Sequence, residues 1–314
     1  MKKSETIDIL IPAYNAEEYL KQCLTSLLKQ TYKNFQIKIV DDGSTDRTSE
    51  IIKEFQKKNK NIIMFKKENE CNISKTRNFL LSKITSKYFA FIDVDDFVEP
   101  TYLEELYSNI TTYNADISCV NKVRHNINKK INLNNNDINS IIVMNSEEAI
   151  AEMLSSKMYN GTCTAKMMKT SLIKDSLFDE KIHYGEDLDF CFKLMQKSQR
   201  ITFSTKKLYH YIIRKNSIVT SKFNEKKLTC IDCYDNIIKK IKDDSNLTIC
   251  AKSMQGLIAI ELLYYTWRDK FKNKEIKTKL KNIIKNSIPF IKKNKRLSKL
   301  YQLTPMVWRL TKLM

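Results

Sequence analysis

A short apolar run that ends in three carboxylates constrains the fold of this chain more than any other feature. Residues 88–92 (Tyr-Phe-Ala-Phe-Ile) have the composition of a buried strand. Asp93, Asp95 and Asp96 follow this run directly. A buried strand cannot hold three such charges, so they must lie at its carboxyl end, where open α/β sheets bind their ligands. Carboxylates this close together repel one another unless a cation or a basic side chain lies among them.

Predicted strands and helices alternate along the first part of the chain. Apolar runs predict strands at residues 7–11, 37–40 and 62–65, and apolar residues at helical spacing predict a helix after each strand. This order is typical of an α/β fold with a mostly parallel sheet and helices on both faces. Polar clusters follow the predicted strands, at residues 12–15, 41–46, 69–77 and 93–96. We therefore expect the ligand-binding loops to share one edge of the sheet.

The last third of the chain is predicted to be helical and is strongly basic. From Lys222 onward 22 Lys and Arg accompany 8 Asp and Glu, which accounts for +14 of the net charge of +19. This charge indicates either a solvated basic face or a binding surface for a polyanion. An anionic membrane is favoured over nucleic acid, because no recognised nucleic-acid motif accompanies the charge. Four residues near the end would insert among lipid headgroups: Tyr301, Met306, Trp308 and Leu310. Self-association is the alternative role for this region.

Cysteine usage and hydropathy predict where the protein resides. Most of the eight cysteines lie inside apolar patterns, as in reduced cytoplasmic proteins. Cys230 and Cys233 form a Cys-x-x-Cys pair on a predicted helix, which indicates either coincidental helical spacing or a zinc or redox site. We find neither a signal peptide nor about 18 uninterrupted apolar residues. We therefore expect a cytoplasmic protein without a spanning helix, peripheral on the inner face of the cytoplasmic membrane.

Five short motifs occur in an order that a known family shares. They are residues 12–15 (Pro-Ala-Tyr-Asn), 40–46 (Val-Asp-Asp-Gly-Ser-Thr-Asp), 74–78 (Ser-x-x-Arg-Asn), 93–96 (Asp-Val-Asp-Asp) and 186–187 (Glu-Asp). Together they resemble a bacterial family-2 glycosyltransferase of the GT-A fold, an inverting enzyme that uses nucleotide sugars. The resemblance covers roughly residues 5–220.

The resemblance implies a division of the chain. Residues 1–222 would form the catalytic domain, with the nucleotide-sugar half at about 1–100 and the acceptor half at about 101–222. Within it, the Asn- and Lys-rich residues 121–139 are predicted to form a loop or hairpin. Residues 223–314 would form the basic helical region, as a membrane-surface or oligomerisation element.

The acidic cluster would hold a metal ion. In the resembled family the Asp-x-Asp pair contacts the ribose and a divalent cation, which implies that Asp93 lies on the ribose side, close to the metal, and that Asp95 binds the metal. Carboxylate oxygens suit Mn²⁺ or Mg²⁺, which would act as a Lewis acid on the departing diphosphate. Asp96 is interpreted as the cap of the following helix. The alternative for the cluster is a solvated acidic turn.

The resemblance assigns five residues to the nucleotide sugar: Pro12, Tyr14, Asn15, Asp42 and Arg77. Tyr14 would stack on the base, Asp42 would accept a hydrogen bond from a uracil N–H, and Arg77 would contact the nucleotide or its phosphates. A packed turn aromatic is the alternative for Tyr14. Asp41 and Asp46 are interpreted as helix-capping residues.

The acceptor side is assigned to the Glu-Asp motif and the loop beyond it. Inverting transfer needs a carboxylate that takes the hydroxyl proton, and the resemblance points to Asp187 as this general base, with Glu186 orienting it. The alternative is that both acids only interact with a helix dipole. Arg214 would pair with the diphosphate. His210 would be a further metal ligand, or a packed and hydrogen-bonded side chain.

The preferred function is therefore a metal-dependent hexosyltransferase. It would move a hexose or N-acetylhexosamine from a UDP-sugar to a glycan of the bacterial surface or a lipid-linked glycan. One alternative is a processive polysaccharide synthase of the same fold, although its usual Gln-x-x-Arg-Trp segment is missing. The other is a non-catalytic module that docks to a membrane or a partner through the basic region.

Overall fold

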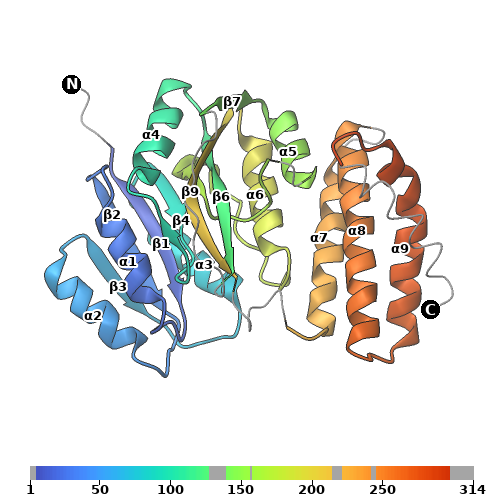
Figure 1. The fold of residues 1–314 in the computed structure, drawn as a ribbon, viewed down its shortest axis with the longest axis horizontal. Coiled ribbons are helices and arrows are strands. Elements are labelled where there is room, and N and C mark those ends of the chain that lie inside the picture. The colour runs from blue at the N-terminus through green and yellow to red at the C-terminus, as the bar shows by residue number, and fades with distance from the viewer. Residues whose placement is uncertain (1–4, 127–138, 156–157, 214–220, 242–244, 298–314) are drawn as a thin grey trace.

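The computed structural model describes residues 5–126, 139–155, 158–213, 221–241 and 245–297. A mixed β-sheet covered by helices forms the larger part, and three helices pack beside it at the C-terminal end (Figure 1). In the described residues nine strands form one sheet, in the order β3-β2-β1-β4-β8-β6-β9-β5 with β7 also paired to β9.

The first four strands carry the loops of the predicted site. They are β1 (Ile7–Ala13), β2 (Phe35–Asp41), β3 (Ile62–Lys66) and β4 (Tyr88–Phe91), and all three pairings among them are parallel. Parallel strands of this kind are buried on both faces, which explains their nearly continuous apolar sequences. Their carboxyl ends meet at one edge, so this part of the sequence prediction is confirmed.

The second half of the sheet is less regular than the sequence analysis predicts. Its strands are β5 (Phe97–Val98), β6 (Ile117–Asn126), β7 (Ile141–Met144), β8 (Lys166–Lys169) and β9 (Ile201–Ile213). Strand β8 lies antiparallel between β4 and β6, so the sheet is mixed and only its N-terminal part is all parallel. The sequence Lys-Met-Met-Lys of β8 is too short to show alternation or a long apolar run. Strand β6 extends to Asn126, so the start of the predicted 121–139 loop is strand, while residues 127–138 lie outside the described residues.

Helices cover both faces of the sheet. One face packs against α1 (Leu20–Leu28), α2 (Thr48–Lys58) and α4 (Tyr102–Thr112), and the other against α3 (Ile73–Ser82), α5 (Ser146–Ser155) and α6 (Glu186–Lys197). The two hydrophobic clusters divide according to the alternation of strand side chains. In β1, for example, Ile9 and Ile11 belong to one cluster and Leu10 to the other.

The C-terminal region is helical, as predicted. It contains the short 3₁₀ segment Glu225–Leu228, followed by α7 (Thr229–Lys240), α8 (Asn246–Arg268) and α9 (Lys274–Lys293). Helix α7 packs against α6, and α8 packs against α5 (Figure 1). The four apolar residues expected to insert into lipid lie beyond residue 297, outside the described residues, so the membrane-surface role remains a prediction.

Helix α8 qualifies by length and composition as a candidate membrane span among the described residues. The sequence analysis missed it because Lys252 and Glu261 interrupt its apolar run. In the structure 44% of its most apolar window is buried inside the protein, and α7, α5 and α9 pack against it. Core helices of soluble proteins pass the same test, so the finding is weak support for a span.

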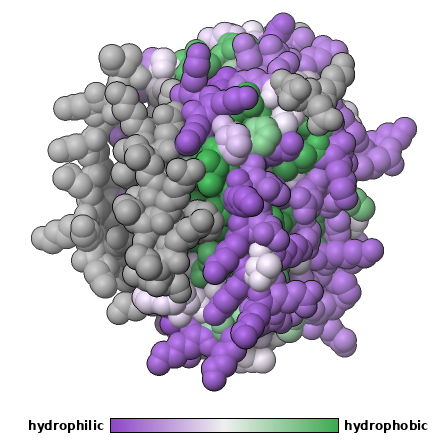
Figure 2. All heavy atoms as spheres, turned by 90° about the vertical axis from the view of Figure 1, so that its right-hand side faces the viewer, coloured by the Kyte–Doolittle hydropathy of each residue, from purple (hydrophilic) through white to green (hydrophobic). Residues whose placement is uncertain are grey.

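On the face that Figure 2 shows, hydrophilic residues cover most of the described surface and hydrophobic residues form a narrower strip.

Candidate active site

Two loops at the carboxyl ends of β1 and β2 are tied together by the Asn15 side chain. Asn15 Oδ1 accepts a hydrogen bond from Thr45 N–H at 2.9 Å, and Asn15 N–H donates to Ser44 Oγ at 3.0 Å. Asn15 has a φ of 45°, a conformation that asparagine tolerates better than most residues. The neighbouring Tyr14 is 51% exposed and Pro12 is buried. Tyr14 is therefore not a packed turn aromatic, and its ring is accessible at the predicted nucleotide side.

Asp42 lies at the end of β2 and is nearly buried. Lys67 Nζ donates to its Oδ1 and Thr76 Oγ1 to its Oδ2, both at 2.8 Å. These partners hold the carboxylate in a fixed orientation, and a uracil N–H would share an oxygen with one of them. Asp46 behaves as expected for a capping residue, since its Oδ1 accepts from Thr48 N–H at the start of α2. Asp41 instead closes the turn after β2 by accepting from Ser44 N–H.

Arg77 joins Asp93 to Glu186 and Asp187 in one cluster. It is 5% exposed and projects from α3. Its guanidinium donates to Asp187 Oδ1 at 2.6 Å, to Glu186 Oε1 at 3.0 Å and to Asp93 Oδ1 at 3.3 Å. Burial alone would lower the pKa of this guanidinium, but the negative charges around it, led by Asp187, raise the pKa well above its ordinary value. Arg77 therefore supplies a basic side chain to Asp93, the first carboxylate of the acidic cluster.

Glu186 and Asp187 begin helix α6, as the sequence predicts. The N-cap residue Gly185 has a φ of 89°, which suits glycine. Cys233 on α7 packs here, with its thiol donating to Gly185 O at 3.3 Å. Burial raises the pKa of the Cys230 thiol to about 12, and both cysteines of the Cys-x-x-Cys pair are free and protonated. The pair therefore packs α7 against the start of α6, in agreement with coincidental helical spacing.

The charge of Glu186 makes stability depend on pH. Burial, followed by the charge of Asp187, raises the pKa of Glu186 to about 7, and Arg77 opposes this rise. The folded protein thus holds this proton more tightly than the unfolded chain, in which a glutamate has a pKa of about 4.3. Tighter proton binding by folded Glu186 therefore stabilises the fold fully below about pH 4.3. This stabilisation is lost as the pH rises through about 7. We expect Glu186→Gln to be more stable than the wild type at pH 8, by about 1–3 kcal/mol, and equally stable at pH 4.

Urea unfolding at the two pH values measures this difference. Glu54→Gln, which changes an exposed glutamate on α2, is the matched control and should show no such pH dependence. A stability gain for Glu186→Gln that is the same at both pH values would contradict the assignment.

Asp96 does not cap the following helix, so that interpretation is wrong. Helix α4 begins only at Tyr102, and Asp96 is 1% exposed. Its carboxylate accepts hydrogen bonds from Tyr209 Oη at 2.6 Å and from Ile212 N–H at 3.0 Å, both from β9. Burial and the charges of Asp93 and Asp95 raise the pKa of Asp96 to about 8. The third carboxylate thus secures the turn after β4 to strand β9.

The His210 ring is packed and hydrogen-bonded between other side chains. Its Nε2 lies 2.8 Å from Glu99 Oε1, its Nδ1 lies 2.7 Å from His125 Nε2, and its ring stacks on Phe97. Side chains alternate along β9, so His210 points to the opposite face from Tyr209, whose hydroxyl contacts the aspartate turn. The structure therefore agrees with the packed, hydrogen-bonded alternative and does not bring His210 together with Asp95. Arg214 lies outside the described residues.

Asp93 and Asp95 fit the requirements of a hard divalent cation only in part. Both are partly exposed at the carboxyl end of β4 and offer carboxylate oxygens, the donors that Mn²⁺ and Mg²⁺ prefer. No cluster of three or more acidic, cysteine or histidine side chains in the described part of the chain is arranged to hold a metal. This donor set suits an ion that substrate phosphates also ligate, since Mg²⁺ sites commonly use one or two carboxylates.

A mixed sheet with polar loops gathered at one edge is shared with a known family of transferases. Residues 8–177, more than half of the chain, match the family "Glycosyl transferase family 2", so the chain belongs to this family. Among curated proteins it is 32% identical over 226 residues to Glycosyltransferase GlyA of Streptococcus pneumoniae, covering 69% of this chain and 32% of GlyA. It is 25% identical over 211 residues to the poly(ribitol-phosphate) β-N-acetylglucosaminyltransferase TarS of Staphylococcus aureus, covering 66% of this chain and 35% of TarS. The chain thus spans about a third of the length of these two relatives.

Solved structures confirm the GT-A-like fold. Residues 1–349 of TarS from S. aureus, in complex with UDP-GlcNAc, superpose with a TM-score of 0.65 at 20% identity, covering 94% of this chain and 82% of that one. The mannosyltransferase PcManGT from Pyrobaculum calidifontis, in complex with GDP-Man and Mn²⁺, superposes with a TM-score of 0.61 at 12% identity, covering 98% and 88%. At these identities the likeness establishes the fold and not the substrate.

Proposed function

We propose that this chain is a metal-dependent, inverting glycosyltransferase. It moves a hexose or N-acetylhexosamine from a UDP-sugar to a hydroxyl group of a bacterial surface glycan or a lipid-linked glycan. One observation carries the proposal: Arg77 holds Asp93, at the donor-side end of β4, together with Glu186 and Asp187, at the start of α6. Donor-binding and proton-accepting groups are thereby joined in a single network.

Asp187 acts in this scheme as the general base. Arg77 holds its Oδ1, and we assign its Oδ2 to accept the proton of the acceptor hydroxyl. The acceptor oxygen then attacks the anomeric carbon from the face opposite the diphosphate, which inverts that centre. Glu186 shares the guanidinium NH1 with Asp187 and so positions the base. A network that fixes the base before the substrate arrives lowers the cost of orienting it.

The donor side is formed by the β1 and β2 loops and by Asp93 and Asp95. Exposed Tyr14 is available to stack on a base, and Asp42 lies at the same strand edge. When bound, a divalent cation on Asp93 and Asp95 would supply Lewis-acid stabilisation of the departing diphosphate. The complexes of the two structural neighbours, with UDP-GlcNAc and with GDP-Man and Mn²⁺, support a nucleotide-sugar donor and a divalent ion.

Thermal unfolding with UDP-GlcNAc, with and without Mn²⁺, tests the proposal. At a free ligand concentration of about 100 Kd we expect a stabilisation of about 2.7 kcal/mol in the presence of the metal. Asp95→Ala should lose the Mn²⁺-dependent part of this gain, and Asp232→Ala, which removes an exposed carboxylate on α7, should keep it. A full Mn²⁺-dependent gain in Asp95→Ala would refute the metal assignment. No gain with any UDP-sugar would refute the donor.

A further inference from the structure

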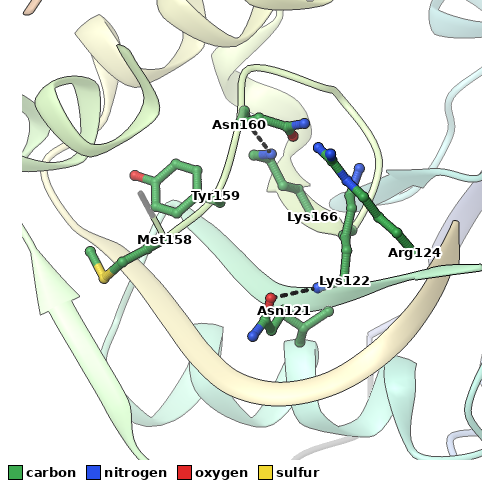
Figure 3. Close-up of a pocket in the computed structure, with 9 residues that line it drawn as sticks. Asn121, Lys122, Arg124, Met158, Tyr159, Asn160 and Lys166 are labelled. Atoms are coloured by element: carbon green, nitrogen blue, oxygen red, sulfur yellow. Dashed lines mark hydrogen bonds between the residues drawn. The ribbon is translucent and has the colours of Figure 1, made fainter. Parts of the chain in front are cut away.

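A basic pocket lies beside the acid network, on the acceptor half of the domain. It has a volume of about 210 Å³ and is lined mainly by the end of β6 and by the segment that leads into β8. Figure 3 shows the ends of Lys122, Arg124 and Lys166 converging beneath the loop that carries Asn160. None of the described residues that line it is acidic. The volume is below the roughly 300–1,000 Å³ of pockets that enclose whole drug-sized ligands, so it suits one charged group of a larger molecule.

The two lysines of the pocket have only uncharged hydrogen-bond partners among the described residues. Lys166, which is 1% exposed, donates from Nζ to Thr162 O at 2.7 Å and to Asn160 O at 3.2 Å. Lys122 donates to the hydroxyls of Thr162 and Thr164. Buried charges are costly unless an opposite charge accompanies them. Burial, followed by the charge of Lys166, lowers the pKa of Lys122 to about 8, and the negative charges of Asp93 and Asp96 oppose this shift without cancelling it. An anion in the pocket would relieve this cost.

Holding the local loop is the structural role of these lysines, but it leaves Arg124 unexplained. Arg124 follows Lys122 on the same strand, is exposed, and reaches the pocket from its rim. Placing the Arg124 guanidinium close to the ammonium groups of Lys122 and Lys166 is unfavourable by itself, because like charges repel. The arrangement becomes favourable when a multivalent anion such as phosphate occupies the space between them.

The pocket adjoins the proposed base and the aspartate turn. Gly161 packs so closely on Leu188, the residue after Asp187, that a Cβ there would lie 2.5 Å from Leu188 Cδ1. On the other side, Lys122 Nζ lies 5.1 Å from the centre of the Tyr209 ring. The Tyr209 hydroxyl in turn bonds to Asp96 and accepts from Asp93 N–H. A group bound in the pocket would therefore belong to a molecule that also reaches the catalytic centre.

We propose that this pocket binds a phosphate group of the acceptor, so that the acceptor is a phosphodiester-linked glycan or polyol chain. The inference rests on the proposed function and specifies its acceptor class. The diphosphate of the donor is the other source of the same chemistry, because Lys122 lies near Asp93 and Asp96. A binding experiment with the donor site filled separates the two sources.

The test is isothermal titration of the full chain with a synthetic glycerol-phosphate hexamer, with and without saturating UDP and Mn²⁺. We expect the wild type to bind the hexamer in both conditions. Arg124→Gln should bind it about tenfold more weakly, which corresponds to one charge-assisted hydrogen bond. Arg124→Lys, which keeps the charge, should recover most of the affinity. Arg124 is exposed, so these variants should keep the fold, which their thermal unfolding checks.

Arg268→Gln, which removes an exposed arginine on α8 that does not line the pocket, is the matched control and should bind the hexamer like the wild type. If Arg268→Gln loses as much affinity for the hexamer as Arg124→Gln, the hexamer binds to the net positive charge of the protein and not to the pocket, which would overturn the proposal. Competition by UDP would assign the pocket to the donor, and no binding by the wild type would exclude this acceptor class. The titration measures binding and does not depend on sugar transfer. The hexamer can therefore fail to bind although the UDP-GlcNAc and Mn²⁺ test succeeds, and it can bind although that test fails.

Discussion

Asp187→Asn is expected to lower kcat for sugar transfer by about 10²- to 10⁴-fold, the usual contribution of a general base. The asparagine amide has nearly the shape of the carboxylate, and its carbonyl oxygen can still accept from Arg77 NH1. What the variant loses is the basic oxygen that takes the acceptor proton. UDP-sugar binding should remain close to that of the wild type, because the nucleotide side of the site is unchanged.

Single-turnover transfer kinetics together with thermal shifts in UDP-sugar distinguish a chemical defect from a binding defect. Asp232→Asn is the matched control, since this aspartate is exposed on α7. A kcat within a few-fold of the wild type would eliminate Asp187 as the base. A variant that also fails to bind UDP-sugar would show that Asp187 acts on the donor instead.

Arg77→Met is expected to destabilise the fold by about 3–5 kcal/mol, the cost of breaking a buried ion pair from one side. Removing the guanidinium leaves Asp93, Glu186 and Asp187 close together without their counter-charge. Urea unfolding at neutral pH measures the loss. The loss should shrink in acid, where the carboxylates are protonated and no longer need a cation.

Arg77→Lys separates charge from geometry. The guanidinium uses NH1 for Glu186 and Asp187 and NH2 for Asp93, and a single ammonium cannot reproduce this fork. The lysine variant should therefore recover part of the stability and little of the transfer activity. Arg268→Met, which breaks an ion pair between an exposed arginine and the partly buried Asp269, should change stability by less than about 1 kcal/mol. If Arg77→Met unfolds at the same urea concentration as the wild type, the network does not stabilise the domain.

Much of the loop cluster at the carboxyl ends of β1, β2 and β4 could be predicted from the sequence because its signals are local. A buried strand that ends in carboxylates, or a turn that carries Pro-Ala-Tyr-Asn, reveals its position at the sheet edge within a few residues. Parallel pairing of β1 with β2 and β4 then brings these ends together. The fold and the helical C-terminal region, predicted from such local patterns, and the family, predicted from the resemblance of five motifs, are confirmed.

The errors concern segments whose local signal was weak or misleading. Residues 121–126 are mostly polar and were predicted to begin a loop or hairpin, yet they continue β6 and pair in parallel with β9. That strand places Lys122 and Arg124 in the pocket. Asp96 has the appearance of a helix cap, but strand β9, more than a hundred residues later, provides its hydrogen-bond donors. The residues next to Asp96 in the sequence do not indicate that its hydrogen-bond donors come from β9.

The sequence by itself determined which chemical groups stand at the ends of the predicted strands and at the start of one helix. It did so because burial excludes unpaired charges from the interior of a strand and leaves them at its end. Only the tertiary structure decided which of these groups meet. Arg77 and Glu186 are 109 positions apart, and Arg77 and Asp187 are 110 apart. Their contact depends on how α3 and α6 pack against the same face of the sheet, a property of the whole core that the spacing of residues along the chain does not encode.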